Sequence, residues 1–212
     1  MPTNTTMKVP LLDLRAQYDT IRAETDDAVR RVMESCHFIG GPEIAGLEEE
    51  IARYSQAAYA VACASGTDAL LIAMWTLGIG PGDEVISPAY SFFATAGTVA
   101  NNGATPVFVD VDPRTYNLDA HRLEAAITPR TKAVVAVSLF GQCCDLPALK
   151  AICDKHQLYL IEDAAQSIGS EWEGKRSGSQ CDFGTFSFFP SKNLGGAGDG
   201  GMITTGNPEF AE

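Results

Sequence analysis

Apolar and polar residues follow a helical period at the start of the chain. Within residues 15–35, apolar side chains recur at positions that share one face of a helix, which predicts an amphipathic helix. A Gly-Gly-Pro sequence that ends at Pro42 interrupts this pattern. Because proline favours the first turn of a helix, a second helix is predicted over residues 42–56. We therefore treat residues 1–58 as an N-terminal helical segment.

From residue 59 onward, short apolar segments alternate with longer helix-like ones. Strands are predicted at residues 59–63, 84–87, 105–110, 132–137 and 159–162, helices at 67–77, 92–101, 119–126 and 146–156, and a turn at 172–175. Two later strands, 183–189 and 202–205, flank a glycine-rich loop. Strands that alternate with helices are typical of an α/β domain, in which helices cover both faces of a mostly parallel sheet. Residues 59–212 are assigned to this domain.

Composition and charge narrow the classes of partner. Hydrophobic residues make up 45% of the 212 residues and charged residues 20%, which is enough for a packed core. The formal net charge is -12, so neither nucleic acid nor an anionic membrane is an expected partner. The sequence has no membrane-spanning apolar run and no secretory signal, so we expect a cytoplasmic protein. Its six cysteines lack metal-like spacing and are expected to be buried, reduced thiols rather than zinc ligands.

Residues that could carry chemistry follow the predicted strands, at the edge where parallel sheets bind ligands. The first strand runs into Ser65-Gly66-Thr67, where small residues and a helix N-terminus would accommodate a phosphate. The strand at 159–162 runs into Asp163 and, three residues later, Gln166. Taken alone, each of these sites is more simply explained as a helix cap.

An acid and an amine in this second half of the chain suggest a more specific chemistry. A buried carboxylate at Asp163 could hold the protonated ring nitrogen of a cofactor such as pyridoxal phosphate, and Gln166 could bond a ring substituent. Lys192 lies between an apolar strand and the glycine-rich loop at 195–201, a setting that favours Schiff-base chemistry. The alternative for Lys192 is an ordinary lysine on a surface loop.

Three motifs together resemble those of the DegT/DnrJ/EryC1/StrS sugar aminotransferases, which belong to fold type I of the pyridoxal-phosphate enzymes. These motifs are Ser65-Gly66-Thr67-Asp68-Ala69-Leu70, Glu162-Asp163-Ala164-Ala165-Gln166-Ser167 and Phe186-Ser187-Phe188-Phe189-Pro190-Ser191-Lys192-Asn193-Leu194-Gly195. The resemblance implies a three-layer αβα large domain with a mixed sheet, and pyridoxal 5'-phosphate as cofactor.

The resemblance also implies a role for individual residues. Lys192 matches the lysine that forms the Schiff base, and Asp163 matches the acid that binds the pyridine nitrogen. Gln166 matches the residue near the ring oxygen, and Phe92 matches the aromatic residue that stacks on the ring. The phosphate-binding positions are matched by Gly66, Thr67 and Ser187. The alternative for Phe92 is an ordinary core aromatic. The family's dehydratases carry histidine in place of the lysine, so Lys192 favours amino transfer.

The activity implied by the family is transfer of an amino group, from a donor such as L-glutamate, to a keto sugar nucleotide in amino-sugar and polysaccharide biosynthesis. Family members are much longer than this chain and form homodimers with shared active sites. We therefore expect a partial sequence that lacks the small C-terminal domain. Two alternatives stay open: a catalytically silent, truncated or regulatory pyridoxal-phosphate-binding protein, and another fold-type-I enzyme such as a lyase.

Overall fold

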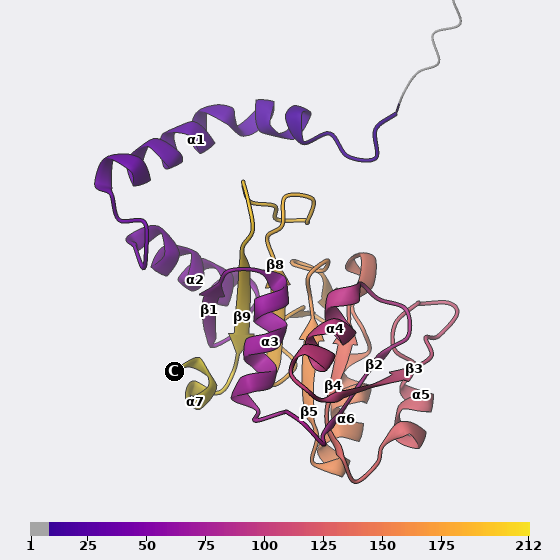
Figure 1. The fold of residues 1–212 in the computed structure, drawn as a ribbon. Helices are drawn as coiled ribbons and strands as arrows, with labels where there is room; N and C mark the ends of the chain where they lie inside the picture. The colour runs from indigo at the N-terminus through magenta and orange to yellow at the C-terminus, as the bar shows by residue number, and fades with distance from the viewer. Residues whose placement is uncertain (1–8) are drawn as a thin grey trace, which may run out of the picture. The chain divides into compact units, whose positions relative to one another are not determined.

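The computed structural model describes residues 9–212, which fall into two compact units (Figure 1). The first unit ends at Glu43 and contains helix α1 (Leu14–Ser35), in which no residue is buried. The second unit is Ile44–Glu212 and contains the sheet. The functional division between residues 1–58 and 59–212 stays a prediction. Within residues 9–212, no helix is long and apolar enough to cross a membrane.

A seven-stranded sheet forms the centre of the second unit. Its strands are β1 (Tyr59–Cys63), β2 (Glu84–Pro88), β3 (Thr105–Val109), β4 (Thr131–Val137), β5 (Tyr159–Asp163), β8 (Phe183–Ser187) and β9 (Gly201–Thr205). They are arranged in the order β1-β9-β8-β5-β4-β2-β3. Strand β9 runs antiparallel to β1 and β8, and the remaining neighbours are parallel. The expected mostly parallel, mixed sheet is confirmed.

Helices cover both faces of the sheet and give the domain three layers. They are α2 (Pro42–Tyr54), α3 (Gly66–Thr76), α4 (Phe93–Asn101), α5 (Ala120–Leu123), α6 (Leu146–His156) and α7 (Pro208–Ala211), with 3-10 turns at Glu124–Ala126 and Leu139–Gly141. Residues of α3 and α4 share a buried cluster with Val135, whereas those of α5 and α6 share another with Val134 (Figure 1). Because successive strand residues point to opposite faces, neighbouring positions of β4 belong to different layers. The expected αβα architecture is confirmed.

Local signals in the sequence account for several element bounds. The Asp145 side chain accepts the backbone N–H of Ala148 at 3.1 Å and so begins α6, and Gln157 ends that helix with a left-handed φ of 58°. Strand β8 stops at Ser187 rather than at residue 189, because the chain turns there and the Ser187 hydroxyl accepts the N–H of Phe189.

The structure confirms one detail expected from the sequence and corrects another. The turn predicted at 172–175 is present, and it forms the tip of a small hairpin of β6 (Glu171–Trp172) and β7 (Lys175–Arg176). All six cysteines are free, but Cys36 is exposed, so the expectation of buried thiols is wrong for it. Cys36 follows the last turn of α1, a helix in which no residue is buried.

Cys143 and Cys144 are buried, as expected. Burial raises the pKa of the Cys143 thiol to about 11 and the pKa of Cys144 still further. Both thiols are therefore protonated at neutral pH, and a protonated, buried thiol is a poor nucleophile. These two cysteines act as small core residues, and they give no reason to expect redox chemistry at this position.

Candidate active site

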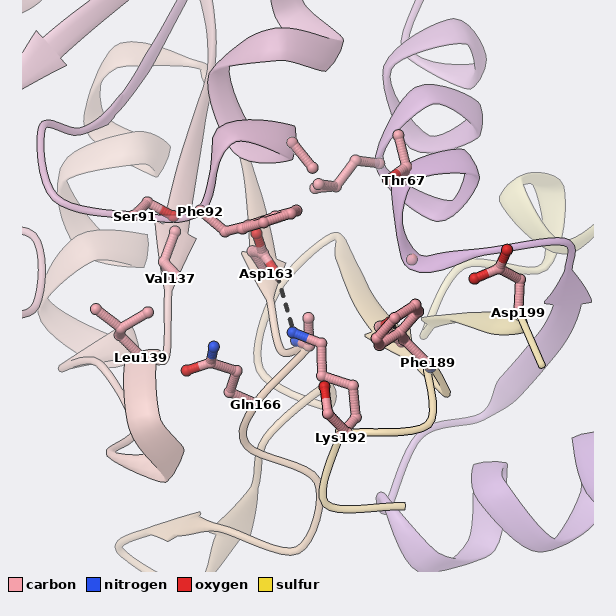
Figure 2. Close-up of a pocket in the computed structure, with 16 residues that line it drawn as sticks. Thr67, Ser91, Phe92, Val137, Leu139, Asp163, Gln166, Phe189, Lys192 and Asp199 are labelled. Atoms are coloured by element: carbon pink, nitrogen blue, oxygen red, sulfur yellow. Dashed lines mark hydrogen bonds between the residues drawn. The ribbon is translucent and has the colours of Figure 1, made fainter. Parts of the chain in front are cut away.

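A pocket of about 520 Å³ opens beside the carboxyl ends of β4, β5 and β8. All the residues singled out from the sequence line it, namely Gly66, Thr67, Phe92, Asp163, Gln166, Ser187 and Lys192. Phe92, Asp163, Gln166 and Lys192 point toward a common space in Figure 2. The structure therefore brings the predicted site residues together, while the role of each one stays a prediction.

The N-terminus of α3 forms one end of this pocket. Ser65 caps the helix, because its hydroxyl accepts the N–H of Asp68 at 3.0 Å, so the helix-cap interpretation is correct for Ser65. The first helical residues, Gly66 and Thr67, line the pocket. The N–H groups in the first turn of a helix lack partners within the helix and, together with the helix dipole, attract anions. A phosphate would be stabilised at this position.

Gly66 lies against Ser187 at the end of β8. A β-carbon added to Gly66 would lie 2.5 Å from the Cβ of Ser187, so any side chain at position 66 would collide with it. This close approach places the Ser187 hydroxyl beside the start of α3 and keeps the space in front of the helix open. The two segments form a narrow cradle of the kind a phosphate group requires.

Asp163 ends β5 and is buried. Its carboxylate accepts hydrogen bonds from the Thr95 hydroxyl at 2.8 Å and from the N–H of Ala165 at 3.3 Å. Burial raises the pKa of Asp163, whereas these hydrogen bonds and the nearby charge of Lys192 oppose that rise. The chain after Asp163 is a turn and not a helix, so the helix-cap interpretation is wrong for this residue.

Lys192 and Phe92 contribute an amine and an aromatic ring to the same space. Lys192 is half-buried, and its Nζ lies 5.8 Å from the centre of the Phe92 ring. Lys192 lines the pocket, so it is not an ordinary surface lysine. The Phe92 side chain is 66% exposed, so the interpretation as a core aromatic is also wrong. A flat ligand could lie against the Phe92 ring within reach of both the amine and the acid.

Gln166 lies at the wall of the pocket opposite the α3 N-terminus (Figure 2). Its side-chain oxygen accepts the backbone N–H of Phe140 at 2.8 Å. With the oxygen used in this way, the amide nitrogen supplies N–H donors to the pocket. Gln166 is therefore set to bind an acceptor atom of a ligand, such as a ring oxygen.

Sequence reasoning missed three polar residues around Asp163. Thr95 and Ser91 form a hydrogen-bonded pair next to its carboxylate, and Ser91 lines the pocket. Glu162 points to the opposite face of β5, where it is fully buried. There its carboxylate accepts bonds from the hydroxyls of Ser138 and Ser177 and from the N–H of Gly178. The signal available in the sequence was the pair of adjacent acids at a strand end.

The comparisons with known proteins agree with this geometry. Residues 19–212 match the model of the DegT/DnrJ/EryC1/StrS aminotransferase family. The chain belongs to this family. Over 203 residues it is 51% identical to the UDP-2-acetamido-2-deoxy-3-oxo-D-glucuronate aminotransferase of Pseudomonas aeruginosa, a match that covers 96% of this chain and 56% of that protein.

Two further relatives within the family bear on function. A pleiotropic regulatory protein of Geobacillus stearothermophilus is 50% identical over 97% of this chain and 55% of its own length. The solved structure of S. venezuelae DesV in complex with a ketimine intermediate superposes with a TM-score of 0.95, at 47% identity, over 97% of this chain and 56% of that one. The chain thus spans about half the length of the relatives it matches.

Proposed function

We propose that this chain forms the cofactor-binding part of a pyridoxal-phosphate-dependent aminotransferase that acts on a keto sugar nucleotide. The observation that carries the proposal is the shared pocket, in which Lys192, the buried Asp163 and the exposed Phe92 ring surround one cavity beside the N-terminus of α3. In this proposal residues 59–212 are the cofactor domain, and residues 1–58 are an N-terminal helical segment.

The described residues fit the shape and charge of pyridoxal phosphate. Gly66, Thr67 and Ser187 would hold the phosphate in the cradle at the start of α3, a position where any side chain on Gly66 would collide. Phe92 would cover one face of the ring, and the amide of Gln166 would donate to its oxygen. When bound, the cofactor supplies an electron sink that stabilises negative charge at the neighbouring carbon.

Two residues would handle protons in this site. A carboxylate at Asp163 would hold the proton on the ring nitrogen, and its hydrogen bonds from Thr95 and Ala165 favour the ionised form that this role requires. The Lys192 amine would carry the cofactor and then, once released, move a proton from the Cα atom of the amino donor. The Phe92 ring would keep water away from the reacting face.

The names of the relatives support the substrate class. A UDP-sugar aminotransferase and DesV, whose structure holds a ketimine intermediate, are both close in sequence to this chain. We propose an amino donor such as L-glutamate and an amino sugar nucleotide as product, used in polysaccharide or related biosynthesis. The six free cysteines fit a reducing compartment such as the cytoplasm.

We further propose a homodimer with shared active sites. Helix α1 has no buried residue and exposes apolar side chains that include Ile21, Val29 and Met33. Apolar side chains at such a density are typical of a surface that another chain covers. Light scattering on the full-length natural protein should give the mass of a dimer; a monomer with full activity would contradict this part of the proposal.

The experiment that tests the function is an amino-transfer assay on the full-length natural protein. It is incubated with pyridoxal phosphate, L-glutamate and a panel of keto sugar nucleotides, and the products are identified by mass spectrometry. Formation of 2-oxoglutarate and of an amino sugar nucleotide in equal amounts supports the proposal. Cofactor binding without any turnover would favour a regulatory protein, a possibility that the Geobacillus relative's name raises. Breakdown of an amino acid without an acceptor would favour a lyase.

A further inference from the structure

The first turn of α4 brings a hydroxyl group into contact with the pocket's buried acid. The Thr95 Oγ1 atom donates to Asp163 Oδ2 at 2.8 Å, although the two residues lie 68 positions apart in the chain. Both are buried, at 1% and 6% exposure. On the other side, the Ser91 hydroxyl lies 2.7 Å from the same Thr95 oxygen.

The direction of these hydrogen bonds follows from the chemistry of the acceptor. An ionised carboxylate can only accept, so Thr95 must donate its single hydroxyl proton to Asp163. The Thr95 oxygen is then an acceptor toward Ser91, which must donate to it. The chain of donors therefore runs from Ser91, at the pocket surface, through Thr95 to Asp163.

Other threonines in the helices use their hydroxyls differently. Thr76 donates to the carbonyl of Ile72 at 2.9 Å, and Thr98 donates to the carbonyl of Ala94 at 2.8 Å. This bond to the carbonyl four residues earlier is the usual choice of threonine within a helix. Thr95 lies one turn before Thr98 in α4, but its hydroxyl leaves the helix and contacts β5.

We propose that Thr95 is a positioning residue that fixes the orientation of the Asp163 carboxylate for the ring nitrogen of the cofactor, with Ser91 fixing Thr95 in turn. This inference rests on the proposed function. Phe92 is the N-cap of α4 and lies between Ser91 and the first turn that carries Thr95, so one short segment sets both the position of the ring and the direction of the acid. Two titratable groups lie near Asp163. Lys192 faces Asp163 from the segment after β8, and Glu162 is the neighbour of Asp163 within β5.

The test compares three variants of the full-length natural protein loaded with pyridoxal phosphate. Thr95→Val keeps the volume but removes the donor, Thr95→Ser keeps the donor, and Thr98→Val removes the hydroxyl of the equally buried threonine one turn later. The visible absorbance of the bound cofactor is titrated with pH. In Thr95→Val the midpoint of this absorbance titration should move to higher pH. A poorly oriented Asp163 holds the proton on the ring nitrogen less firmly, and the ring then withdraws less electron density from the linkage to Lys192.

Turnover should fall in parallel, by about tenfold, as for the loss of one hydrogen bond to a charged group. Thr95→Ser should restore both the midpoint and most of the turnover, and Thr98→Val should keep the midpoint of the parent. A Thr95→Val protein that loses thermal stability but keeps its midpoint would overturn the inference and leave Thr95 a packing residue.

A second variant covers the case in which Thr95→Val does not fold. Ser91→Ala removes only the outer bond of the chain and should move the midpoint in the same direction by a smaller amount. An unchanged midpoint in Ser91→Ala would then overturn the inference. The parent protein distinguishes this result from failure of the proposed function: a parent that gives no visible absorbance with the cofactor removes the basis of both.

Discussion

The side-chain oxygen of Gln166 accepts the backbone N–H of Phe140 at 2.8 Å, and this contact determines whether the oxygen or the nitrogen of the amide faces the pocket. Phe140 holds a left-handed φ of 55°, an uncommon conformation for a bulky residue. Its N–H is thereby turned toward Gln166. The nitrogen end of the amide is left for the ligand, so the wall of the pocket at this point offers donors.

The first prediction follows from this polarity. Gln166→Glu keeps an oxygen for Phe140 but presents a second, negatively charged oxygen to the ring oxygen of the cofactor. We expect the dissociation constant for pyridoxal phosphate to rise by about tenfold or more, the scale of one lost hydrogen bond with added repulsion. Equilibrium titration of the visible absorbance measures it. Gln157→Glu, an exposed residue at the end of α6, makes the same charge change away from the pocket and should bind like the parent.

The second prediction concerns the amine. Borohydride reduction of the protein loaded with pyridoxal phosphate should fix the cofactor on Lys192, because reduction makes the linkage permanent. Peptide mapping by mass spectrometry locates the label. Lys192→Ala should carry no label and lose turnover, whereas Lys132→Ala, which alters an exposed lysine of β4, should behave like the parent. Label on a different lysine in the parent protein would remove Lys192 from this role.

The third prediction concerns the charge of Asp163. Asp163→Asn keeps an acceptor for Thr95 but cannot hold a proton on the ring nitrogen. We expect the cofactor to remain bound and turnover to fall on the order of a hundredfold or more, as for the loss of one charge interaction in the transition state. Single-turnover kinetics with L-glutamate measure the loss. Equal rates in Asp163→Asn and the parent would show that Asp163 has no part in the chemistry.

The same substitution should stabilise the protein without its cofactor. Burial raises the pKa of Asp163 above its ordinary value of 3.8, so the folded state favours the neutral acid. Its contribution to the free energy of unfolding is fully present below about pH 4 and is lost as the pH rises through the raised pKa. Asp163→Asn stays neutral throughout, so its stability relative to that of the parent should increase as the pH rises through the raised pKa.

Thermal unfolding of the two cofactor-free proteins, followed from pH 4 to pH 8, checks this expectation. A constant difference in melting temperature over that range would mean that Asp163 does not titrate there. The opposite signs of the two effects of Asp163→Asn, on turnover and on stability, are typical of a group held in place for function.

The fourth prediction concerns the cradle at the start of α3. Gly66→Ala would place its Cβ 2.5 Å from the Cβ of Ser187, so the start of α3 or the end of β8 must shift and the proposed phosphate site must change shape. We expect weaker binding of pyridoxal phosphate and a loss of about 1–3 kcal/mol in stability, as for overpacking of a tight contact. Calorimetry with and without the cofactor measures both quantities.

Gly46→Ala is the matched control, because a β-carbon at Gly46 in α2 meets no atom within 4 Å. That variant should bind the cofactor normally and gain about 0.5–1 kcal/mol, since alanine favours a helix more than glycine does. Equal effects of the two substitutions on cofactor binding would mean that the contact between Gly66 and Ser187 does not shape the phosphate site.

Local patterns in the sequence were sufficient for the longer helices and strands and for the residues at the ends of strands. Runs of apolar residues identify β4 and β5, because strands buried on both faces have few polar positions. The hairpin of β6 and β7 was missed, because each strand has two residues and so shows no periodicity. The order of strands with the antiparallel β9 also lay beyond local patterns, since it depends on pairings between distant segments.

The contacts that give each site residue its chemistry could not be predicted in this way. Thr95 contacts Asp163 because the first turn of α4 lies beside the carboxyl end of β5, and nothing near either residue in the chain indicates that pairing. The orientation of Gln166 depends on the left-handed conformation of Phe140, which no glycine or asparagine marks. Sequence reasoning therefore locates the reactive groups, whereas tertiary packing determines their hydrogen-bond partners.

Glu162 and Asp163 are adjacent in β5 and point to opposite faces of the sheet. Because each acid has its own hydrogen-bond partners, the two together favour one register of the strand. A slip of one residue against β4 and β8 would exchange the two acids. Asp163 would then face the three donors that now bind Glu162 with a side chain one methylene shorter, and Glu162 would place a longer carboxylate in the pocket. Both errors leave a buried carboxyl group without its hydrogen-bond partners, which costs about 1–3 kcal/mol each. The two acids are thus expected to disfavour the shifted pairing.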